Sequence, residues 1–392
     1  MSEIKIAADS GGGTVSLKGP ATTTGNAAIQ LTLPDVATGG SVVTADSSGN
    51  ITATGTFYAS NSVGRNLVIN GDFSCAQRST AAVSTSNGNN EGYQTVDRWR
   101  FYAGGAGVLN QQQVDLTAAT DPDGFYKALK VDVTTVDSSI AAGDFINFQQ
   151  NIEGFNWAQL NYGRSDAKSV TVSFWVKSTK TGIYTFSIRN GAADRSYIAE
   201  YTVSSSNTWE KKTITIPGDT SGTWLITNGI GARCCFNLMN GTDGTASANS
   251  WGAGNKWSTT NQVNFFDNTS NDFYITGVQI ETGSTATEFE HKPYGQVLAE
   301  CQRYYEGLHM NAGTAMWMAW PHGSGPAYKM EYSYKVTKRA VPTSQLEGNA
   351  SWSGTTPLSF HSTNVAAFHH ASTEYYLSDA NLDLCYSFDA EL

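Results

Sequence analysis

The stretch NDFYITGVQIETGSTATEFEHKPYGQVLAECQRYYE, residues 271–306, decides how the chain is organised. Its first part, Phe273 to Ile280, has the apolar pattern of a β-strand. A turn at Gly283 and an extended crossing segment follow, and Pro293 stands where a helix would begin. Before this stretch the pattern is that of antiparallel β-sheet, and after it a second β-unit begins. The stretch is therefore predicted to join two modules.

The end of the stretch predicts one short helix, within the linking segment 291–306, with a single apolar stripe. The stripe consists of Val297, Leu298, Cys301, Tyr304 and Tyr305. Such a short helix is marginal in water by itself, so the stripe must pack on something. The alternatives are the flank of the preceding domain and two sister helices around a three-fold axis. We favour the second, because the stripe has no apparent partner in its own neighbourhood, and we therefore predict a homotrimer.

The composition restricts the class of protein. Of 392 residues, 15% are charged and 11% aromatic, and 39 are glycine, a mixture typical of strands joined by tight turns. The net charge of −10 gives no gain from counterion release at phosphates, so we expect no nucleic-acid partner. The sequence has no basic run that suits an anionic membrane and no apolar run near the length of a membrane span, so we expect no membrane insertion.

The cysteines indicate where the chain is made. Their spacing fits neither a disulfide framework nor a zinc site. The five are Cys75, Cys234, Cys235, Cys301 and Cys385. We expect reduced, mostly buried thiols and assembly in a reducing cytoplasm. The start, MSEIKIAADSGGG, lacks the pattern of a secretory signal, so we expect release by cell lysis.

Residues 1–64 contain short alternating apolar pieces separated by turns. Ile4 and Ile6 form one piece and Val15 and Leu17 the next, and further pieces lie at 29–33 and 42–43. Each piece is too short to bury a core alone, so the segment is either disordered or shares its core with copies of itself. The regular alternation favours the second alternative, and we predict a β-structured shaft or attachment segment.

Residues 65–290 predict one large antiparallel sandwich. Apolar residues recur with period 2 in successive runs, and turn signals such as Asn190-Gly191 and Asn240-Gly241 separate the runs. Alternation means one buried and one wet face, and eight or more such strands predict two packed sheets. The fold class is therefore all-β, with a small C-terminal β-domain over residues 307–392.

Several motifs resemble known families. NLVINGDFS (66–74) and NDFYITGVQIETG (271–283) resemble the first and last strands of jelly-roll carbohydrate-binding modules. That resemblance implies that the two strands are neighbours, and in many members a calcium ion lies there. Here Thr276-Gly277 stands where an aspartate ligand is expected, which leaves Asp72 as a weak metal candidate.

A second resemblance is to bacteriophage tail proteins. It is carried by KIAADSGGGTVSLKGP near the start, by HKPYGQVLAECQRYYE (291–306), by YSYKVTKRAVPT (332–343) and by the final DAEL. The resemblance implies a homotrimeric tail fibre, a virion tail appendage assembled in the host bacterial cytoplasm. Residues 1–64 would bind other tail or baseplate proteins, and residues 307–392 would form the distal end.

A catalytic function finds little support in the sequence. The elbow motif G-x-S-x-G is absent. A glycan depolymerase needs two carboxylates at a set separation, and Glu281, Glu288 and Glu290 with Asp72 or Asp97 are the available groups. We interpret them as solvated or ion-paired. His370 could form a three-fold metal site on a trimer axis, but a surface histidine is the simpler reading, so we predict neither an enzyme nor a cofactor.

Aromatic residues give the best binding hypothesis, because sugar rings stack on exposed Trp and Tyr while their hydroxyls bond to amides. The stretch 249–262 has the pattern of a long loop with Trp251, Trp257, Asn249 and Asn255. Each Trp there is either a plug for a small core or a ligand platform. Trp320 and Trp352 are alternatives in the distal unit, whereas Trp99 is predicted to be a core residue.

The leading function is thus receptor binding: a trimeric fibre that adsorbs to host surface polysaccharide or lipopolysaccharide through many weak contacts. One alternative is a structural head fibre or capsid decoration protein. Another is a depolymerising tailspike.

Overall fold

The computed structural model describes the backbone of residues 3–7, 14–18, 44–45, 51–52, 64–308, 328–346, 358–361, 363–370 and 386–392. Side chains are described for residues 64–307, 332–344, 363–364 and 387–392. The chain divides into two compact units, Met1–Ala59 and Ser60–Leu392.

The first unit contains two antiparallel strand pairs. β1 (Glu3–Ala7) pairs with β2 (Thr14–Lys18), and β3 (Thr44–Ala45) pairs with β4 (Ile51–Thr52). Ile4 lies opposite Leu17 and Ile6 opposite Val15, so the two alternating pieces predicted there form one hairpin. The pieces predicted at 29–33 and 42–43 lie outside the described residues.

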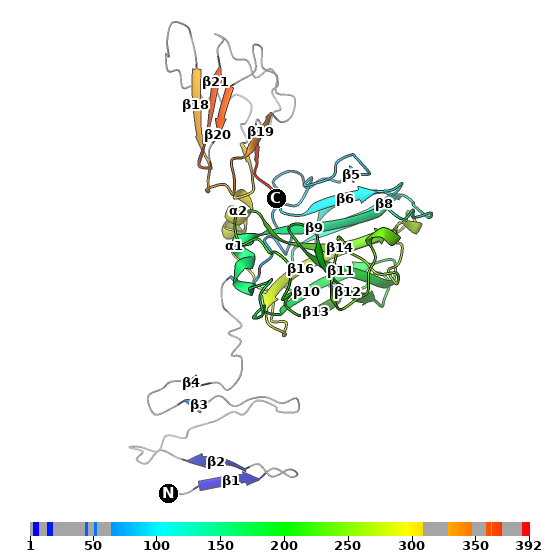
Figure 1. Cartoon of the computed structure of the whole chain (residues 1–392), viewed down its shortest axis with the longest axis vertical. Coiled ribbons are helices and arrows are strands. Elements are labelled where there is room, and N and C mark those ends of the chain that lie inside the picture. Colours follow the sequence, from blue (N-terminus) through cyan, green and yellow to red (C-terminus); the bar gives the residue numbers. More distant parts are fainter. Residues whose placement is uncertain are drawn as a thin grey trace. The chain divides into compact units, whose positions relative to one another are not determined.

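The second unit is built on two six-stranded antiparallel sheets (Figure 1). The first, here called the β16 sheet, has the order β13-β10-β16-β8-β7-β5, and the second, the β14 sheet, has the order β15-β12-β11-β14-β9-β6. Their strands are β5 (Val83–Thr85), β6 (Arg100–Gly104), β7 (Val108–Asp115), β8 (Lys127–Thr135), β9 (Phe145–Glu153), β10 (Val170–Ser178), β11 (Gly182–Asn190), β12 (Arg195–Val203), β13 (Glu210–Ile216), β14 (Ile230–Asn240), β15 (Trp251–Ala253) and β16 (Asp272–Thr282). The predicted antiparallel jelly-roll sandwich is confirmed.

Aromatic rings from both sheets fill the space between them. Phe148 and Phe236 of the β14 sheet stack with ring centres 5.2 Å apart, and Phe174 of the β16 sheet meets Phe236 edge-on at 5.0 Å. Trp99 is fully buried in the same core, as predicted. The period-2 pattern of the sequence thus places one large apolar side chain after another on the inner faces.

The opening segment runs beside the closing strand, as the resemblance to binding modules implied. Leu67 N donates to Ile280 O at 2.8 Å, and Val278 N donates to Gly71 O at 2.8 Å. Gly71 is required here, because a Cβ atom would lie 2.0 Å from the carbonyl oxygen of Val278. The opening segment itself is not an assigned strand.

The start of this segment is tied to the crossing segment 283–293. The carboxylate of Glu290 accepts hydrogen bonds from Gly64 N and, at 2.8 Å, from Asn66 N. Arg65 donates to the carbonyl oxygen of Glu288. Glu290 is buried, so its charge is compensated chiefly by these backbone donors.

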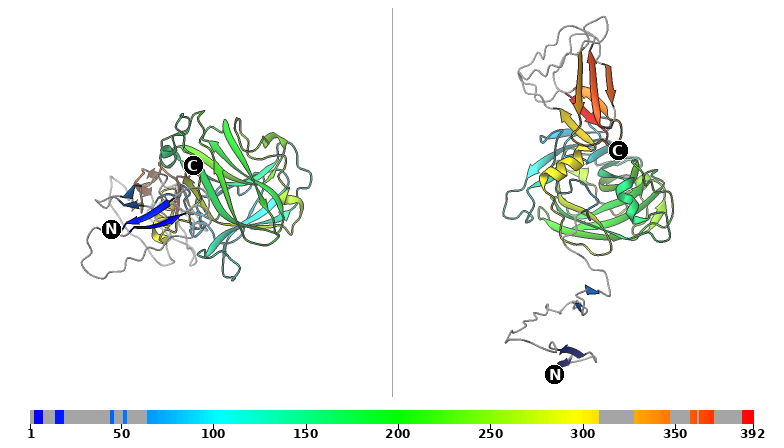
Figure 2. Two further views of the ribbon diagram at one scale, coloured as in Figure 1. Left: turned by 90° about the horizontal axis from the view of Figure 1, so that it is seen from below. Right: turned by 90° about the vertical axis from the view of Figure 1, so that its left-hand side faces the viewer.

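Short helices and smaller sheets complete the unit (Figure 2). α1 (Gly154–Trp157) is followed by the 3₁₀ turn η1 (Ala158–Leu160), and two further 3₁₀ turns are η2 (Thr242–Gly244) and η3 (Phe265–Asp267). α2 (Tyr294–Gln302) leads into β17 (Tyr305–Leu308), which pairs with β22 (Tyr386–Asp389), and β22 in turn pairs with β19 (Thr343–Leu346). β18 (Tyr328–Ser333), β21 (Val365–His370) and β20 (Leu358–His361) form another small sheet. Within the described residues, no helix has the length and apolar character needed to cross a membrane.

The predicted helix is shorter than expected, and the prediction that its stripe lacks a partner is wrong. The helix ends at Gln302, so Tyr304 and Tyr305 lie beyond it. Val297 and Cys301 are buried against Cys75 of the opening segment. The stripe therefore packs on the flank of its own sandwich, the alternative that we did not favour. It gives no support to a homotrimer, which stays a prediction on the resemblance alone.

Candidate functional site

The outer face of the β14 sheet carries rows of polar side chains. Cross-strand pairing joins Ser187, Cys235, Gln149 and Arg100 in one row, and Asn237, Asn147 and Tyr102 in the next. A third row joins Arg189, Arg233 and Asn151. These positions alternate with the core residues of β6, β9, β11 and β14, so they point away from the core. We call these ten residues the polar face.

Arg189 connects the polar face to the loop that follows β15. Its Nη1 donates to Asn255 Oδ1 at 2.5 Å, and its Nη2 donates to Gln149 Oε1 at 2.7 Å. The guanidinium carbon lies 4.8 Å from the centre of the Trp257 ring, which is the geometry of a cation–π contact. Burial lowers the pKa of Arg189, but an arginine stays charged in a protein.

Trp257 is held firmly at the edge of this face. Its ring lies 5.2 Å from that of Phe145, and its Nε1 donates to Asn240 Oδ1. Its backbone N donates to Gly244 O at 3.0 Å, and its carbonyl oxygen accepts from Asn237 Nδ2. The ring is half-buried, so part of its apolar surface remains exposed beside the Arg189 guanidinium.

Five buried polar atoms of the face lack a hydrogen-bond partner among the described residues. They are Arg100 Nε, Asn147 Oδ1, Ser187 Oγ, Arg189 Nε and Arg233 Nε, on strands β6, β9, β11 and β14. Buried polar groups nearly always find a hydrogen-bond partner, so such atoms indicate a bound water or a polar ligand. The face thus holds donors and acceptors whose hydrogen bonds the described protein atoms do not supply.

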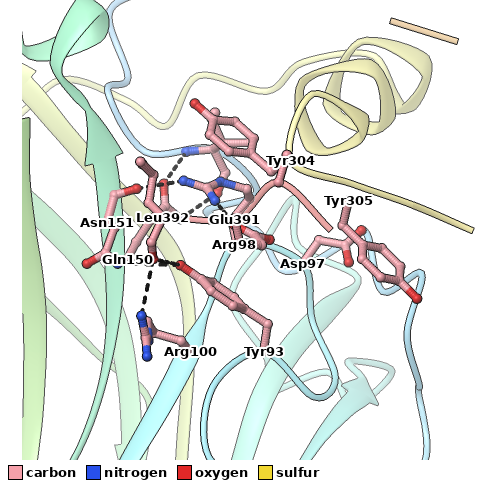
Figure 3. A network of polar contacts seen from close by, with 12 residues as sticks. Tyr93, Asp97, Arg98, Arg100, Gln150, Asn151, Tyr304, Tyr305, Glu391 and Leu392 are labelled. Carbon is pink, nitrogen blue, oxygen red and sulfur yellow. Dashed lines mark hydrogen bonds and ion pairs between the residues drawn. The ribbon is translucent and has the colours of Figure 1, made fainter. Parts of the chain in front are cut away.

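A chain of amides continues from the polar face to the last residues of the sequence (Figure 3). Gln149 Nε2 donates to Asn151 Oδ1 at 2.6 Å, and Asn151 Nδ2 donates to Leu392 O at 2.6 Å. The same oxygen accepts from Arg100 Nη1 and from the Tyr93 hydroxyl, both at 3.1 Å. Residue 392 thereby fixes one border of the face.

A buried ion pair fixes Glu391, the residue before Leu392. Arg98 and Glu391 form this pair, and their side chains are 1% and 4% exposed. Arg98 Nη2 also donates to Asn151 O at 2.6 Å, and its guanidinium lies 3.4 Å from the Tyr304 ring centre (Figure 3). The Tyr304 hydroxyl donates to Glu153 at 2.7 Å, and burial raises the pKa of Tyr304 to about 12.

The structure separates the aromatic residues predicted as a sugar site. Trp257 and Asn255 meet at the polar face through Arg189. Trp251 instead lies on the edge strand β15, where a loop was predicted, and its ring packs 5.2 Å from Tyr197. Its Nε1 donates to Pro217 O at 2.7 Å, so Trp251 takes the core role that was the alternative.

The remaining predicted residues have other positions. Asn249 adopts a φ of 61° and donates its backbone N to Ile198 O at 2.8 Å, so it forms the turn before β15. Trp320 and Trp352 lie outside the described residues, as does the side chain of His370. Asp72 accepts from Ser74 N and Ser74 Oγ, at 3.3 and 2.9 Å, which is a local turn contact.

The carboxylates considered for catalysis hold structural bonds. Glu281 accepts from Thr287 N at 2.8 Å and from Thr287 Oγ1 at 2.7 Å, and Glu290 accepts from the opening segment. Asp97 accepts from Gln77 Nε2 at 2.8 Å and pairs with Arg78 at 3.3 Å. The ion pair of Asp97 agrees with the interpretation as ion-paired groups, whereas the expectation of solvated groups is wrong for Glu281, Glu290 and Asp97, which are buried.

A separate pocket of about 310 Å³ lies at the ends of β10 and β16. Its lining consists of Thr179, Lys180, Thr181, Asp267, Asn268 and Asn271. Lys180 pairs with Asp267 across it. The lining has no aromatic ring on which a sugar could stack, so the polar face is the better candidate.

Most of the polar face was not predicted. Arg189 follows a run noted for its apolar positions, the run that holds Gln149 and Asn147 was not singled out, and only the register of β11, β14 and β9 brings the three residues together. A signal was available in β9, FINFQQNIE, where Asn147, Gln149 and Asn151 place an uncharged amide at every second position. An outer face formed by amides at alternate positions, here almost fully buried, is unusual enough to draw attention to this sheet.

No protein-family model matches the sequence, and no curated protein matches it. Among solved structures, similarity extends to the enzymatically active domain of tailspike protein 4 of bacteriophage CBA120, at 13% identity and a TM-score of 0.28. That match covers 56% of this chain and 22% of the tailspike chain.

Two carbohydrate-binding modules are similar over nearly their whole length. A CBM4 structure shares 15% identity over 55% of this chain and 98% of its own, with a TM-score of 0.28. The family 11 carbohydrate-binding module of the cellulase Lic26A-Cel5E of Clostridium thermocellum shares 13% identity over 54% and 99%, with a TM-score of 0.26.

Proposed function

We propose that the chain binds a glycan on the polar face, as the receptor-binding part of a bacteriophage tail fibre. The observation that carries the proposal is the half-buried Trp257 ring beside Arg189 and Asn255, with Arg189 Nε one of the buried polar atoms that lack a partner in the described part of the chain. A sugar needs both elements: an apolar surface for its C–H face and fixed donors and acceptors for its hydroxyls.

The charges of the polar face suggest the kind of glycan. Arg100, Arg189 and Arg233 stand together on one face of a chain whose net charge is −10. Guanidinium groups bind carboxylates and phosphates better than they bind neutral hydroxyls. The proposed ligand is therefore a bacterial surface polysaccharide or lipopolysaccharide that carries acidic groups.

Binding without hydrolysis is the proposed mode of action. The carboxylates that a depolymerase could use hold structural hydrogen bonds in the described part of the chain. Weak sites become effective when a trimer and several fibres engage one cell surface together. A purified chain that releases new reducing ends from host polysaccharide would contradict this mode.

The site is tested by glycan binding of the purified chain and of Trp257→Ala. We expect affinity to fall about tenfold, because loss of one stacked ring costs on the order of 1.4 kcal/mol. Trp209→Ala is the matched control: Trp209 is also half-buried, but it lies just before β13, outside the polar face, and its Nε1 donates to Asp121 at 2.9 Å. Equal affinity of Trp257→Ala and the native chain would refute the site.

The placement on the virion needs its own measurement. An antibody to this chain should label the tails of intact particles, and labelling of heads would favour a head fibre or decoration protein. The mass of the chain in solution tests the homotrimer, and a monomeric mass would contradict it.

A further inference from the structure

Three ligand-type side chains from distant parts of the sequence meet on the flank of the sandwich. They are Cys75 of the opening segment, Asp97 just before β6, and Cys301 of α2, and all three are buried. Their two sulfur atoms and one carboxylate oxygen lie within 4.8 Å of one another. The local spacing of the cysteines gave no sign of this, because the cluster is formed by the fold.

We propose that Cys75, Asp97 and Cys301 bind one zinc-like divalent cation. Zinc bonds of about 2.3 Å to sulfur and about 2.0 Å to oxygen, at tetrahedral angles, place donor atoms roughly 3.5–3.8 Å apart. Cys75 Sγ now donates to Asp97 Oδ2 at 3.0 Å, so a small opening of the cluster makes room. Two thiolates and one carboxylate suit zinc and not calcium or magnesium, which prefer oxygen donors. A water molecule would complete the tetrahedron.

The backbone around the cluster is fixed before any ion binds. Asp97 N donates to Cys75 O at 3.0 Å, and Asn70 Nδ2 donates to both Cys75 O and Asp97 O, at 2.8 and 2.9 Å. Asn70 Oδ1 accepts from Cys75 N at 2.9 Å. Asn70 thus holds two of the ligands in register, and α2 brings the third, which is the rigid support that a metal site requires.

Charge balance also fits a dication. Arg78 pairs with Asp97 at 3.3 Å, so the empty cluster is neutral when both thiols are protonated. The neighbouring Cys301 and burial raise the pKa of Cys75, and burial raises that of Cys301. Binding replaces the two thiol protons by one divalent cation, which leaves the net charge of the buried cluster unchanged.

This site would have a structural role distinct from glycan binding. It would join α2 to the opening segment and to the turn before β6, three elements that the sequence separates by up to 226 positions. The polar face lies on the outer side of the β14 sheet and shares none of the three ligands. Failure of one proposal therefore leaves the other standing.

The test uses the full chain, reduced, stripped with a chelator and dialysed against Zn²⁺. We expect one equivalent of bound zinc per chain by elemental analysis and a rise in the thermal midpoint. With Co²⁺ in place of zinc, a sulfur-to-cobalt charge-transfer band should report thiolate ligation. Cys301→Ser should lose the zinc and the band, whereas Cys235→Ser, which removes a buried thiol that is not part of the cluster, should keep both.

Four results would overturn the proposal. The native chain could bind no stoichiometric zinc, it could bind Co²⁺ without the charge-transfer band, or Cys301→Ser could bind zinc like the native chain. The first two do not depend on the folding of a variant. The fourth is an isolated chain two hydrogens lighter, with Cys75 joined to Cys301, which would show that the pair forms a disulfide instead.

Discussion

Replacing Glu391 by glutamine removes one charge of the buried pair with Arg98 while keeping the shape of the side chain. Both partners are almost fully buried, so water cannot compensate the remaining guanidinium. Breaking a buried pair from one side costs about 3–5 kcal/mol. Arg98 keeps its bond to Asn151 O and its contact with the Tyr304 ring, so we expect the lower end, about 3 kcal/mol.

The assay is thermal and urea unfolding followed by circular dichroism. In a unit of this size, about 3 kcal/mol corresponds to a fall in the thermal midpoint of roughly 6 °C. Asp389→Asn is the control: Asp389 pairs with Arg78 at 3.1 Å, but its side chain is 39% exposed, so we expect a loss of at most about 1 kcal/mol. The double change Arg98→Met with Glu391→Leu should recover much of the stability, because it removes both charges.

A loss below about 1 kcal/mol for Glu391→Gln would refute the reasoning, since such values are typical of exposed pairs. An equal loss for Asp389→Asn would refute it as well, because burial would then not be the deciding variable. A double variant less stable than Glu391→Gln would show that the pair contributes more than its own desolvation costs.

The other predictions concern backbone, pH and assembly. Gly277→Ala should lower the free energy of unfolding, measured in urea, by about 2 kcal/mol. Gly277 has a φ of +63°, and a Cβ atom there would lie 2.6 Å from Phe125 Cζ. At Gly295, the control, an added Cβ meets open space, so Gly295→Ala should be tolerated. The pKa of Tyr304 rises from its ordinary value of 10.0 to about 12 in the folded chain. The stability that this difference contributes is fully present below pH 10 and is lost as the pH rises toward 12. Tyr304→Phe should therefore lose stability less steeply over that range, and parallel curves would contradict the assignment. Sedimentation should give a trimeric mass if the chain is a fibre protein.

The pattern of the sequence predicted the sandwich because alternation is a local property. Val172 and Phe174 alternate with polar neighbours whatever strand lies beside them, and the structure places both in the core. The pairing of the opening and closing segments came from a resemblance, and Leu67 with Ile280 confirms it. Local pattern and family motif together thus gave the fold class.

Less of the candidate site than of the fold could be predicted, because the site depends on the register between strands that are distant in sequence. Arg189 and Gln149 become neighbours only through β14, which lies between their strands. The prediction that the helix stripe lacks a partner failed for the same reason. In the sequence, Val297 and Cys301 show that one face of the helix is apolar, but they do not show that Cys75 covers it. Trp251 and Trp257 share one sequence environment, and only the pairing of β15 with β12 assigns one to the core.

The tie between the opening segment and Glu290 determines how the second unit would carry tension. A pull on the chain at Gly64 acts first on the carboxylate of Glu290, and through Arg65 on the carbonyl oxygen of Glu288. The load then passes along residues 283–293 toward α2. When the pull peels the segment away from the sandwich, we expect the bonds of Leu67 to β16 to be loaded only after this clamp yields. Force entering at Gly64 would then act first at the rim, before it reaches the aromatic core between the sheets.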